Sequence, residues 1–216
     1  MNSFTIFDGL LYTGKPVLTG TTPITMLQGN ALPPAGDTGA YYYDWEPNLT
    51  LASAPMLASQ MVAQLGFARS VAPAATLGAY NLAPHANYWD FVDPVNSGGS
   101  LAAAQAMNNA LRPIAQSSDW LFPCLYTWYT NDPSWWIAAV GNIAEARRLS
   151  DRKLAPFVNP NDQTTAAALV DPTLWGRQLQ LIRQSCDGIV LWGGYQEVWS
   201  AESAWWLAAK SVLGLA

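Results

Sequence analysis

The chain has 216 residues, half of them hydrophobic and only 12% charged, which is enough for one domain with a substantial buried core. The net charge of −5 and the lack of any basic run argue against a nucleic-acid partner. Because no stretch reaches about 18 uninterrupted apolar residues, we expect no membrane span. The segment 1–16 has no basic region followed by an apolar one, so we also expect no signal peptide, and the location of the protein stays open.

The N-terminal part of the chain contains two predicted strands and no predicted helix. PITMLQGNA (23–31) has the composition of a strand, and FTIFDGLL (4–11) is a weaker candidate. The segment ALPPAGDTG, which follows the second strand, has the composition of a loop.

From residue 40 onward, predicted strands and helices alternate regularly. The strands cover 40–47, 76–84, 120–129, 153–160 and 188–195. The helices cover 53–72, 100–118, 132–150, 171–186 and 200–214. Ser100, Asp132 and Asp171 are candidate N-caps, and Pro113 is expected to end or kink its helix.

This alternation predicts βαβ units and a parallel sheet covered on both faces, in a single domain over residues 1–216. No G-x-G-x-x-G or P-loop motif favours a nucleotide-binding sheet. A full (β/α) barrel needs eight units and about 250 residues. We find five clear units and therefore predict an α/β fold that is an abbreviated, TIM-barrel-like (β/α) barrel.

Polar and aromatic residues gather at the C-terminal end of each predicted strand, which is where a (β/α) barrel carries its active site. They are Asp44 and Glu46; Tyr80 and Asn81; Tyr126, Trp128 and Tyr129; Asn159 and Asn161; and Trp192 and Tyr195. We also expect residues 88–90 and Asp93 to form one wall of a cleft. Asn159, Asn161, Asp162 and Gln163 either bind sugar hydroxyls or simply turn the chain.

The eleven tryptophans and nine tyrosines are unusual for this length. We expect about half of the tryptophans in the core and others in a cleft, where flat rings stack on sugars or other ligands. The helical tryptophans are assigned to packing: Trp135, Trp136, Trp175, Trp205 and Trp206. Arg147 and Arg148 are expected to form ion pairs.

The sequence implies no metal and no cofactor. Cys124 and Cys186 are too few for a disulfide framework or a metal cluster, so we expect two free, buried thiols. His85 is the only histidine, and a metal site with one histidine is poor. We expect this residue to serve loop structure or to contact a ligand at the rim.

The segment YYYDWEP (41–47) places two carboxylates in an otherwise aromatic run. On an extended strand Tyr42, Asp44 and Glu46 share one face, and Tyr41, Tyr43 and Trp45 share the other. If the second face packs under helices, both carboxyl groups face the barrel interior, where burial and mutual repulsion raise the pKa of one of them. A carboxyl group that keeps its proton near neutral pH is what a general acid requires.

A simpler interpretation is that Asp44 hydrogen-bonds within a loop and Glu46 pairs with a surface arginine. D-x-E alone is a weak motif, and its place at the end of an aromatic strand is what favours catalysis.

Four segments, DWEP, LFPCLYTWY, EARRLSDRKLAPFVNP and DGIVLWGGY, resemble the hyaluronidase-like glycoside hydrolases in order and spacing. The resemblance covers roughly residues 40–200. DWEP is also similar to the chitinase motif D-x-x-D-x-D-x-E, although the first two acidic positions fall on Gly39 and Tyr42. This sequence has no counterpart to half of the N-terminal barrel of the hyaluronidase-like family. The disulfides and the secretion signal of that family are absent as well.

This resemblance implies that Glu46 protonates the glycosidic oxygen while Asp44 orients a substrate 2-acetamido group, whose oxygen acts as the internal nucleophile. Tyr126 matches the position that contacts this group, and Trp192 matches the ring under the sugar. The remaining candidate substrate-binding residues are Trp128, Tyr80, Asn81, Asn159 and Tyr195. No cofactor is needed.

We therefore predict a glycoside hydrolase that acts on an amino-sugar-containing polysaccharide. The alternative is a non-catalytic carbohydrate-binding or structural protein, such as a component of a virion or another larger assembly, that keeps a degenerate barrel.

Overall fold

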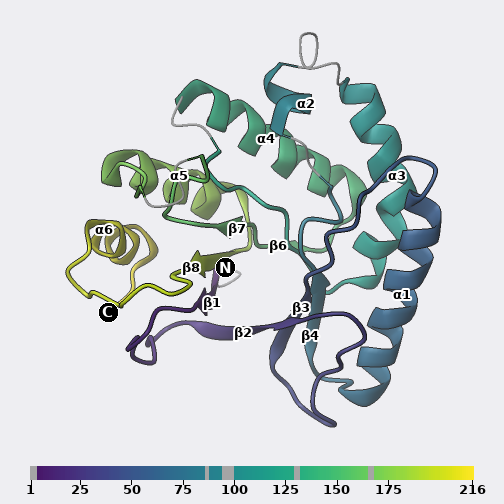
Figure 1. Cartoon of the computed structure of the whole chain (residues 1–216), viewed down its shortest axis with the longest axis horizontal. Helices are drawn as coiled ribbons and strands as arrows, with labels where there is room; N and C mark the ends of the chain where they lie inside the picture. The colour runs from purple at the N-terminus through teal and green to yellow at the C-terminus, as the bar shows by residue number, and fades with distance from the viewer. Residues whose placement is uncertain (1–3, 86–87, 94–99, 129–131, 165–167) are drawn as a thin grey trace.

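The computed structural model describes residues 4–85, 88–93, 100–128, 132–164 and 168–216 (Figure 1). A six-stranded sheet lies at its centre in the order β4-β3-β2-β1-β8-β7, and each neighbouring pair is parallel. Its strands are β1 (Thr5–Leu10), β2 (Thr22–Leu27), β3 (Ala40–Tyr43), β4 (Thr76–Ala79), β7 (Phe157–Val158) and β8 (Gly188–Gly193).

A second parallel pair, β5 (Trp120–Leu121) and β6 (Lys153–Leu154), lies between the two edges of this sheet. A bridge between Tyr80 and Phe122 links it to the end of β4, and a bridge between Cys124 and Phe157 links it to β7. The sheet therefore curls around an interior. The fold is the expected abbreviated α/β barrel of the TIM type.

Five helices follow strands and cover the sheet: α1 (Ala54–Val71), α3 (Leu101–Ser117), α4 (Asp132–Leu149), α5 (Pro172–Ser185) and α6 (Ala204–Leu213). The loops 11–21 and 28–39, which flank β2, contain no helix. Figure 1 shows β2 at the lower edge with no helix over it, and four of its six residues are exposed. The barrel is thus shortened by missing helices at its N-terminal part.

The predicted strands are longer than the observed ones, and proline explains two of the differences. The expected strand 120–129 keeps only Trp120–Leu121, and the expected strand 153–160 is split into β6 and β7. Pro123 follows the first of these, and Pro156 lies in the gap of the second. Proline has no N–H donor and so interrupts a hydrogen-bonded ladder.

The helix boundaries agree with the predicted caps at two positions. Ser100 accepts a hydrogen bond from the Ala103 backbone N–H, and Asp171 accepts two at the start of α5. Asp132 is the first residue of α4, and residues 129–131 lie outside the described ranges. Of the two outcomes expected at Pro113, the end of the helix does not occur, because α3 continues to Ser117. The turn after Pro113 stays helical because Ile114 and Ala115 are fully buried, which offsets the loss of one backbone hydrogen bond.

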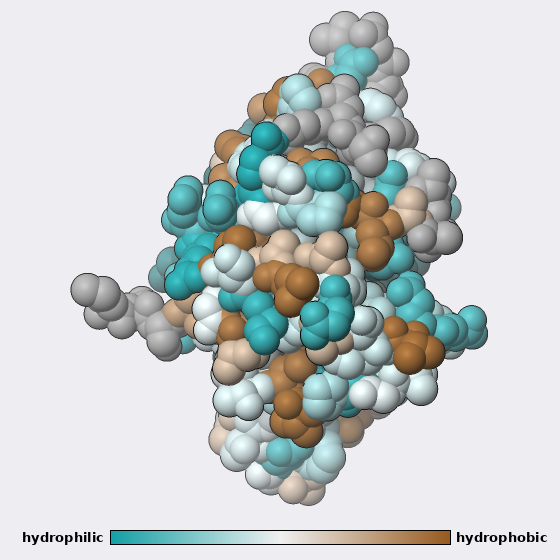
Figure 2. Space-filling view, turned by 90° about the vertical axis from the view of Figure 1, so that its left-hand side faces the viewer, coloured by the Kyte–Doolittle hydropathy of each residue, from teal (hydrophilic) through white to brown (hydrophobic). Residues whose placement is uncertain are grey.

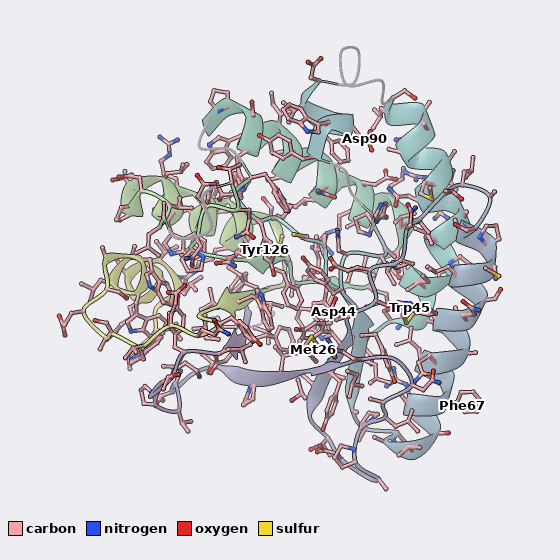
Figure 3. The ribbon with its side chains drawn as sticks, in the orientation of Figure 1. Met26, Asp44, Trp45, Phe67, Asp90 and Tyr126 are labelled. Atoms are coloured by element: carbon pink, nitrogen blue, oxygen red, sulfur yellow. The ribbon has the colours of Figure 1, made fainter. Side chains whose placement is uncertain are left out.

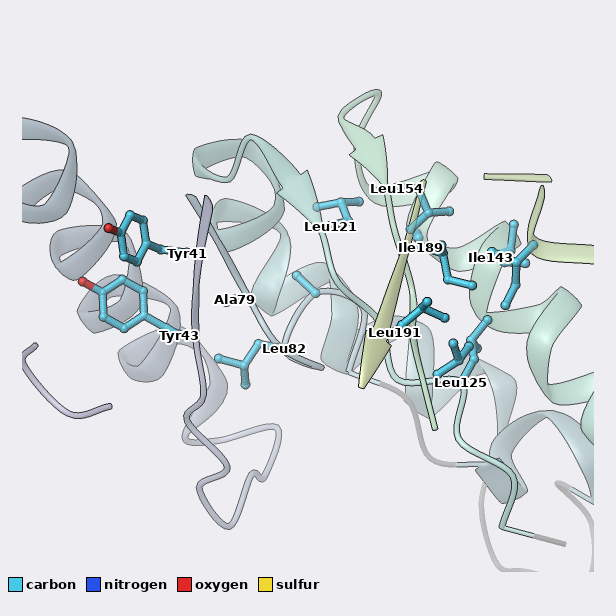
Figure 4. Close-up of a cluster of buried hydrophobic side chains, with 14 of the residues drawn as sticks. Tyr41, Tyr43, Ala79, Leu82, Leu121, Leu125, Ile143, Leu154, Ile189 and Leu191 are labelled. Atoms are coloured by element: carbon cyan, nitrogen blue, oxygen red, sulfur yellow. The ribbon is translucent and has the colours of Figure 1, made fainter. Parts of the chain in front are cut away.

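One part of the core lies between the sheet and the helices. Tyr41 and Tyr43 point from β3 away from the barrel interior (Figure 4), and the Gln64 side chain of α1 donates a hydrogen bond of 3.1 Å to the Tyr43 hydroxyl. The helical tryptophans pack here as expected: Trp135, Trp175, Trp205 and Trp206 are buried, and Trp136 is partly buried.

On the face seen in Figure 2, which carries α5 and α6, apolar groups are interspersed with polar ones.

The other part of the core fills the barrel interior. Its buried members are Phe7, Ile24, Ala40, Tyr42, Trp120, Phe122, Ala155, Phe157 and Val190. The Phe7 ring meets Trp120 edge-on at 5.0 Å between ring centroids, and it meets Phe122 in the same way at 5.8 Å. Aromatic packing therefore closes the N-terminal part of the barrel.

Gly78 lies where the interior is most crowded. A Cβ atom there would lie 2.5 Å from the Trp120 carbonyl oxygen and 2.6 Å from the Phe122 ring. We expect Gly78→Ala to lower the free energy of unfolding by about 1–3 kcal/mol, because the backbone of β5 must shift to accept the methyl group. Denaturant titration measures this change.

The matched control is Gly66→Ala in α1, where nothing lies within 4 Å of the added Cβ. This change is expected to stabilise the protein by up to about 1 kcal/mol, because alanine favours a helix interior over glycine. Equal effects of the two substitutions would contradict the close packing described here.

Candidate active site

Asp44 lies just beyond the C-terminal end of β3. Its backbone N–H donates to the Leu27 carbonyl oxygen at 3.1 Å, so the ladder with β2 continues one residue past the strand. This extended path places Asp44 on the same side as the interior residue Tyr42. The Asp44 Oδ1 atom is buried and has no hydrogen-bond partner among the described residues. Burial raises the pKa of Asp44 above its ordinary value.

Glu46 lies two residues further on and is exposed at the same rim. Its pKa is raised, mainly by partial burial and in addition by the negative charge of Asp44. Among the ion pairs of the described residues, none includes either carboxylate. The simpler interpretation had Glu46 in an ion pair with a surface arginine, and the described residues show no such pair.

Of the three aromatic residues expected to pack under helices, Tyr41, Tyr43 and Trp45, only the first two do so. Tyr41 and Tyr43 pack under helices, but the Trp45 side chain remains 37% exposed because the strand has already ended. Figure 3 shows Asp44 near Met26 and Trp45 on the side of α1 and α3.

Two cavities open at this rim. The first, the carboxylate cavity, has a volume of about 280 Å³ and is lined by Tyr42, Asp44, Glu46, Tyr80, Tyr126, Trp128, Phe157, Gln163 and Trp192. The second, the side cavity, has a volume of about 310 Å³ and is lined by Glu46, Tyr80, Asn81, Tyr88, Trp89, Cys124, Leu125, Tyr126, Trp128, Trp135, Ala138, Ala139 and Asn142. Because they share four residues, Glu46 among them, the two cavities adjoin.

Most of the candidate residues meet at these cavities. Six line the carboxylate cavity: Asp44, Glu46, Tyr80, Tyr126, Trp128 and Trp192. Asn81 lines the side cavity, as do Tyr88 and Trp89 of the short helix α2 (Tyr88–Val92). Tyr129 lies outside the described residues.

Two candidates are not among the lining residues. The Asn159 side chain accepts a hydrogen bond from the Asn161 backbone N–H at 2.9 Å, which makes it part of a turn. Tyr195 is 74% exposed. The prediction that both contact a ligand in the same hollow as Asp44 therefore finds no support in the geometry.

Aromatic rings line the carboxylate cavity. Trp192 and Tyr42 meet edge-on with centroids 6.2 Å apart, and Tyr42 meets Phe157 at 4.7 Å. Trp192 lies across Gly9 of β1, where an added Cβ would be 3.0 Å from the indole ring. A ring in this place can stack against the apolar face of a sugar.

Tyr80, Tyr126 and Cys124 form a polar group beside the two carboxyls. The rings of Tyr80 and Tyr126 are tilted by 36° with centroids 6.2 Å apart, and their hydroxyls interact. Burial raises the pKa of both tyrosines far above the neutral range, so both keep a proton to donate. Burial also raises the pKa of Cys124 to about 11, so its thiol is protonated at neutral pH. Both cysteines are free, and each is partly buried.

His85 serves the loop in which it lies. Its backbone N–H donates to the Asn108 side chain at 2.8 Å, and its ring Nδ1 lies 3.3 Å from the Asn81 carbonyl oxygen. It lines neither cavity, which favours the structural interpretation. Within the described residues, no group of three or more histidine, cysteine, aspartate or glutamate side chains is placed to hold a metal ion.

Asn142 of α4 is a site residue that the sequence did not reveal. It is 3% exposed, it lines the side cavity, and its Oδ1 atom has no partner among the described residues. An asparagine in the middle of an apolar helix was the only available signal, and such a residue satisfies its polar atoms in many ways.

The unpartnered Asp44 carboxylate leads to a stability prediction. A carboxyl group with a raised pKa binds its proton more tightly in the folded state, so stability falls as pH rises from the unfolded-state pKa through the folded-state pKa. Asp44→Asn removes this loss. We expect the variant to exceed the original protein at neutral pH by on the order of 1 kcal/mol, with the advantage shrinking as pH falls.

Chemical denaturation of both proteins, from neutral pH down to the unfolded-state pKa of aspartate, measures the stability difference and its dependence on pH. Asp151→Asn, at an exposed position between α4 and β6, is the control and should change stability by less than about 0.5 kcal/mol. A less stable Asp44→Asn protein at neutral pH would contradict the assignment of an unsatisfied buried charge.

The fold and the rim together define a class: an α/β barrel of the TIM type that carries two carboxylates and a wall of aromatic rings at the C-terminal ends of its strands. No protein-family model and no curated protein matches the sequence. Among solved structures, bee venom hyaluronidase is similar with a TM-score of 0.58 and 16% identity, over 83% of this chain and 70% of that one.

A second similar structure is bee venom hyaluronidase in complex with a hyaluronic acid tetramer, with a TM-score of 0.56 and 16% identity over 82% of this chain. This chain spans 66% of that protein's length. At this level of identity the likeness establishes a shared fold. Among the described residues, no helix combines the length and the apolar character needed to cross a membrane.

Proposed function

We propose that this protein is a glycoside hydrolase that cleaves an amino-sugar polymer with the help of the substrate's own 2-acetamido group. Glu46 donates a proton to the glycosidic oxygen. The acetamido oxygen attacks the anomeric carbon as the bond to the leaving sugar breaks. Water then opens the resulting ring intermediate and returns the proton to Glu46, so the anomeric configuration is retained.

Asp44 has a separate role in this reaction. Its buried Oδ1 atom accepts the acetamido N–H, which holds the acetamido oxygen at the anomeric carbon and stabilises the positive charge that develops on the group. Trp192 stacks under the sugar, and the Tyr126 hydroxyl donates to the acetamido oxygen from the side opposite the attack.

One observation carries this proposal: a buried carboxylate oxygen without a partner lies in the same aromatic-lined cavity as a second carboxyl group whose pKa is raised. A structural carboxylate would have found a donor within the protein. The likeness to a hyaluronidase fold supports the same conclusion from a separate direction.

The direct test is incubation of the purified protein with several amino-sugar polymers, followed by measurement of released reducing ends and of the first-formed anomer by NMR. We expect release with retained configuration. An inverted product would contradict the assisted mechanism. Binding without any release would instead favour the non-catalytic carbohydrate-binding alternative.

A further inference from the structure

The basic residues of the barrel gather at one of its two ends. Eight of the ten basic residues lie near the C-terminal ends of helices or the N-terminal ends of strands, which is the end opposite the candidate site: Arg69, Arg112, Arg147, Arg148, Arg152, Lys153, Arg183 and Lys210. As expected, Arg147 pairs with Asp187 at 2.9 Å and Arg148 pairs with Glu145 at 2.6 Å.

The other two basic residues do not line the cavities. Lys15 is held by Asp8 at 2.5 Å with both side chains largely buried, and Arg177 is an exposed residue of α5. The segments outside the described residues contain no lysine, arginine or histidine in their sequence. The side chains of these segments therefore add no positive charge.

Carboxyl groups and unpartnered acceptor atoms distinguish the two cavities. Among the described residues, their lining includes the carboxyl groups of Asp44 and Glu46 and no basic side chain. Three of their oxygen atoms are buried without a partner among the described residues: Asp44 Oδ1, Asn81 Oδ1 and Asn142 Oδ1. A ligand that satisfies these atoms must bring hydrogen-bond donors.

Hydroxyl and acetamido N–H groups are donors of this kind, whereas a sugar carboxylate can only accept and carries a negative charge toward Asp44. In polymers that alternate an amino sugar with a uronic acid, a carboxylate stands next to every amino sugar. Such a chain would bring a like charge to a partly buried carboxylate, which is unfavourable at short range.

We infer that the substrate is an uncharged polymer of N-acetylated amino sugars, and that the side cavity holds the sugar next to the cleaved bond. This inference rests on the proposed function for the place of cleavage. It differs from what the similar structure binds, which is a hyaluronic acid tetramer.

The test compares two tetrasaccharides of equal length, one uncharged (N-acetylglucosamine tetramer) and one with alternating uronates (hyaluronan tetramer). Calorimetry with Glu46→Gln measures binding without turnover, and the original protein reports hydrolysis. We expect the uncharged tetramer to bind at least about tenfold more tightly at low ionic strength. Raising the salt concentration should improve only the binding of the uronate tetramer, since screening weakens repulsion.

Charge variants sharpen this test. Gln163→Lys places a cation in the wall of the carboxylate cavity and should raise the affinity for the uronate tetramer relative to the uncharged one by several-fold at low salt. Gln60→Lys on the exposed face of α1 adds the same charge elsewhere and should leave that ratio unchanged.

Equal or tighter binding of the uronate tetramer would overturn the inference, even if it is hydrolysed and the proposed function stands. Failure of both tetramers to bind would overturn it as well. Tight binding of the uncharged tetramer without hydrolysis of any polymer would support the inferred ligand class and refute the proposed activity.

Discussion

Glu46→Gln is expected to lower kcat on an N-acetylated amino-sugar polymer by about 10²–10⁴-fold, with substrate affinity changed by only a few-fold. Glutamine has the size of glutamate but no proton to give to the leaving oxygen. The side chain makes no ion pair among the described residues, so its neighbours should stay in place. Separate measurements of kcat by reducing-end release and of Kd by calorimetry distinguish lost chemistry from lost binding.

The control for this variant is Glu202→Gln, the same substitution at an exposed residue before α6. It should leave both constants unchanged. A Glu46→Gln protein that retains a tenth or more of the original kcat would refute the role of Glu46 as the general acid. Equal losses in kcat and affinity would instead indicate a damaged cavity.

Asp44→Asn is expected to lower kcat by at least about 10²-fold, although the same variant is expected to be the more stable protein. The amide cannot stabilise the positive charge that develops on the attacking acetamido group. A more stable but less active protein separates this prediction from simple unfolding. Assays of kcat and denaturation on one preparation check both effects together.

Substrate chemistry provides a second readout for Asp44. On the same polymer after removal of its acetyl groups, the original protein should become about as poor a catalyst as Asp44→Asn is on the acetylated form, because the internal nucleophile is gone. Undiminished activity of the original protein on the deacetylated polymer would show that the acetamido group takes no part.

The pH dependence of the reaction follows from the same pair. Glu46 must be protonated, so its raised pKa sets the alkaline limit of activity. The negative charge of Asp44 contributes to this elevation, so Asp44→Asn should shift the alkaline limit and the Glu46 pKa to lower pH. Carboxyl NMR titration of both proteins measures the shift. A shift to higher pH would contradict the electrostatic coupling of the two groups.

The sequence predicted the barrel because its signal is repeated. From β3 onward, β3, β4, β5, β7 and β8 are each followed by a helix, and only β6 is followed directly by another strand. An error at one predicted boundary therefore did not change the predicted fold. The meeting of Asp44, Tyr126 and Trp192 followed from topology alone, since the C-terminal ends of parallel strands in a barrel share one rim.

The failures arose where a residue's direction depends on the turn after a strand. Tyr195 follows Gly193 and Gly194, whose φ angles are +140° and +81°, and this turn leads the side chain away from the cavity. Asn159 also follows the C-terminal end of a strand, but its side chain accepts a hydrogen bond from the Asn161 backbone N–H within the turn.

The side cavity was predicted only in part: Tyr88 and Trp89 line it as expected, and Asp90 and Asp93 do not. The share of α4 in its wall was missed, because it arises from tertiary packing of α4 against the end of β5.

A crystal structure of the Glu46→Gln protein with an N-acetylglucosamine oligomer would test this account most directly. We expect an acetamido N–H within hydrogen-bond distance of Asp44 Oδ1, a glycosidic oxygen beside residue 46, and the next sugar against Asn142 in the side cavity. A sugar chain bound elsewhere on the molecule, or one whose acetamido groups all point away from Asp44, would contradict it.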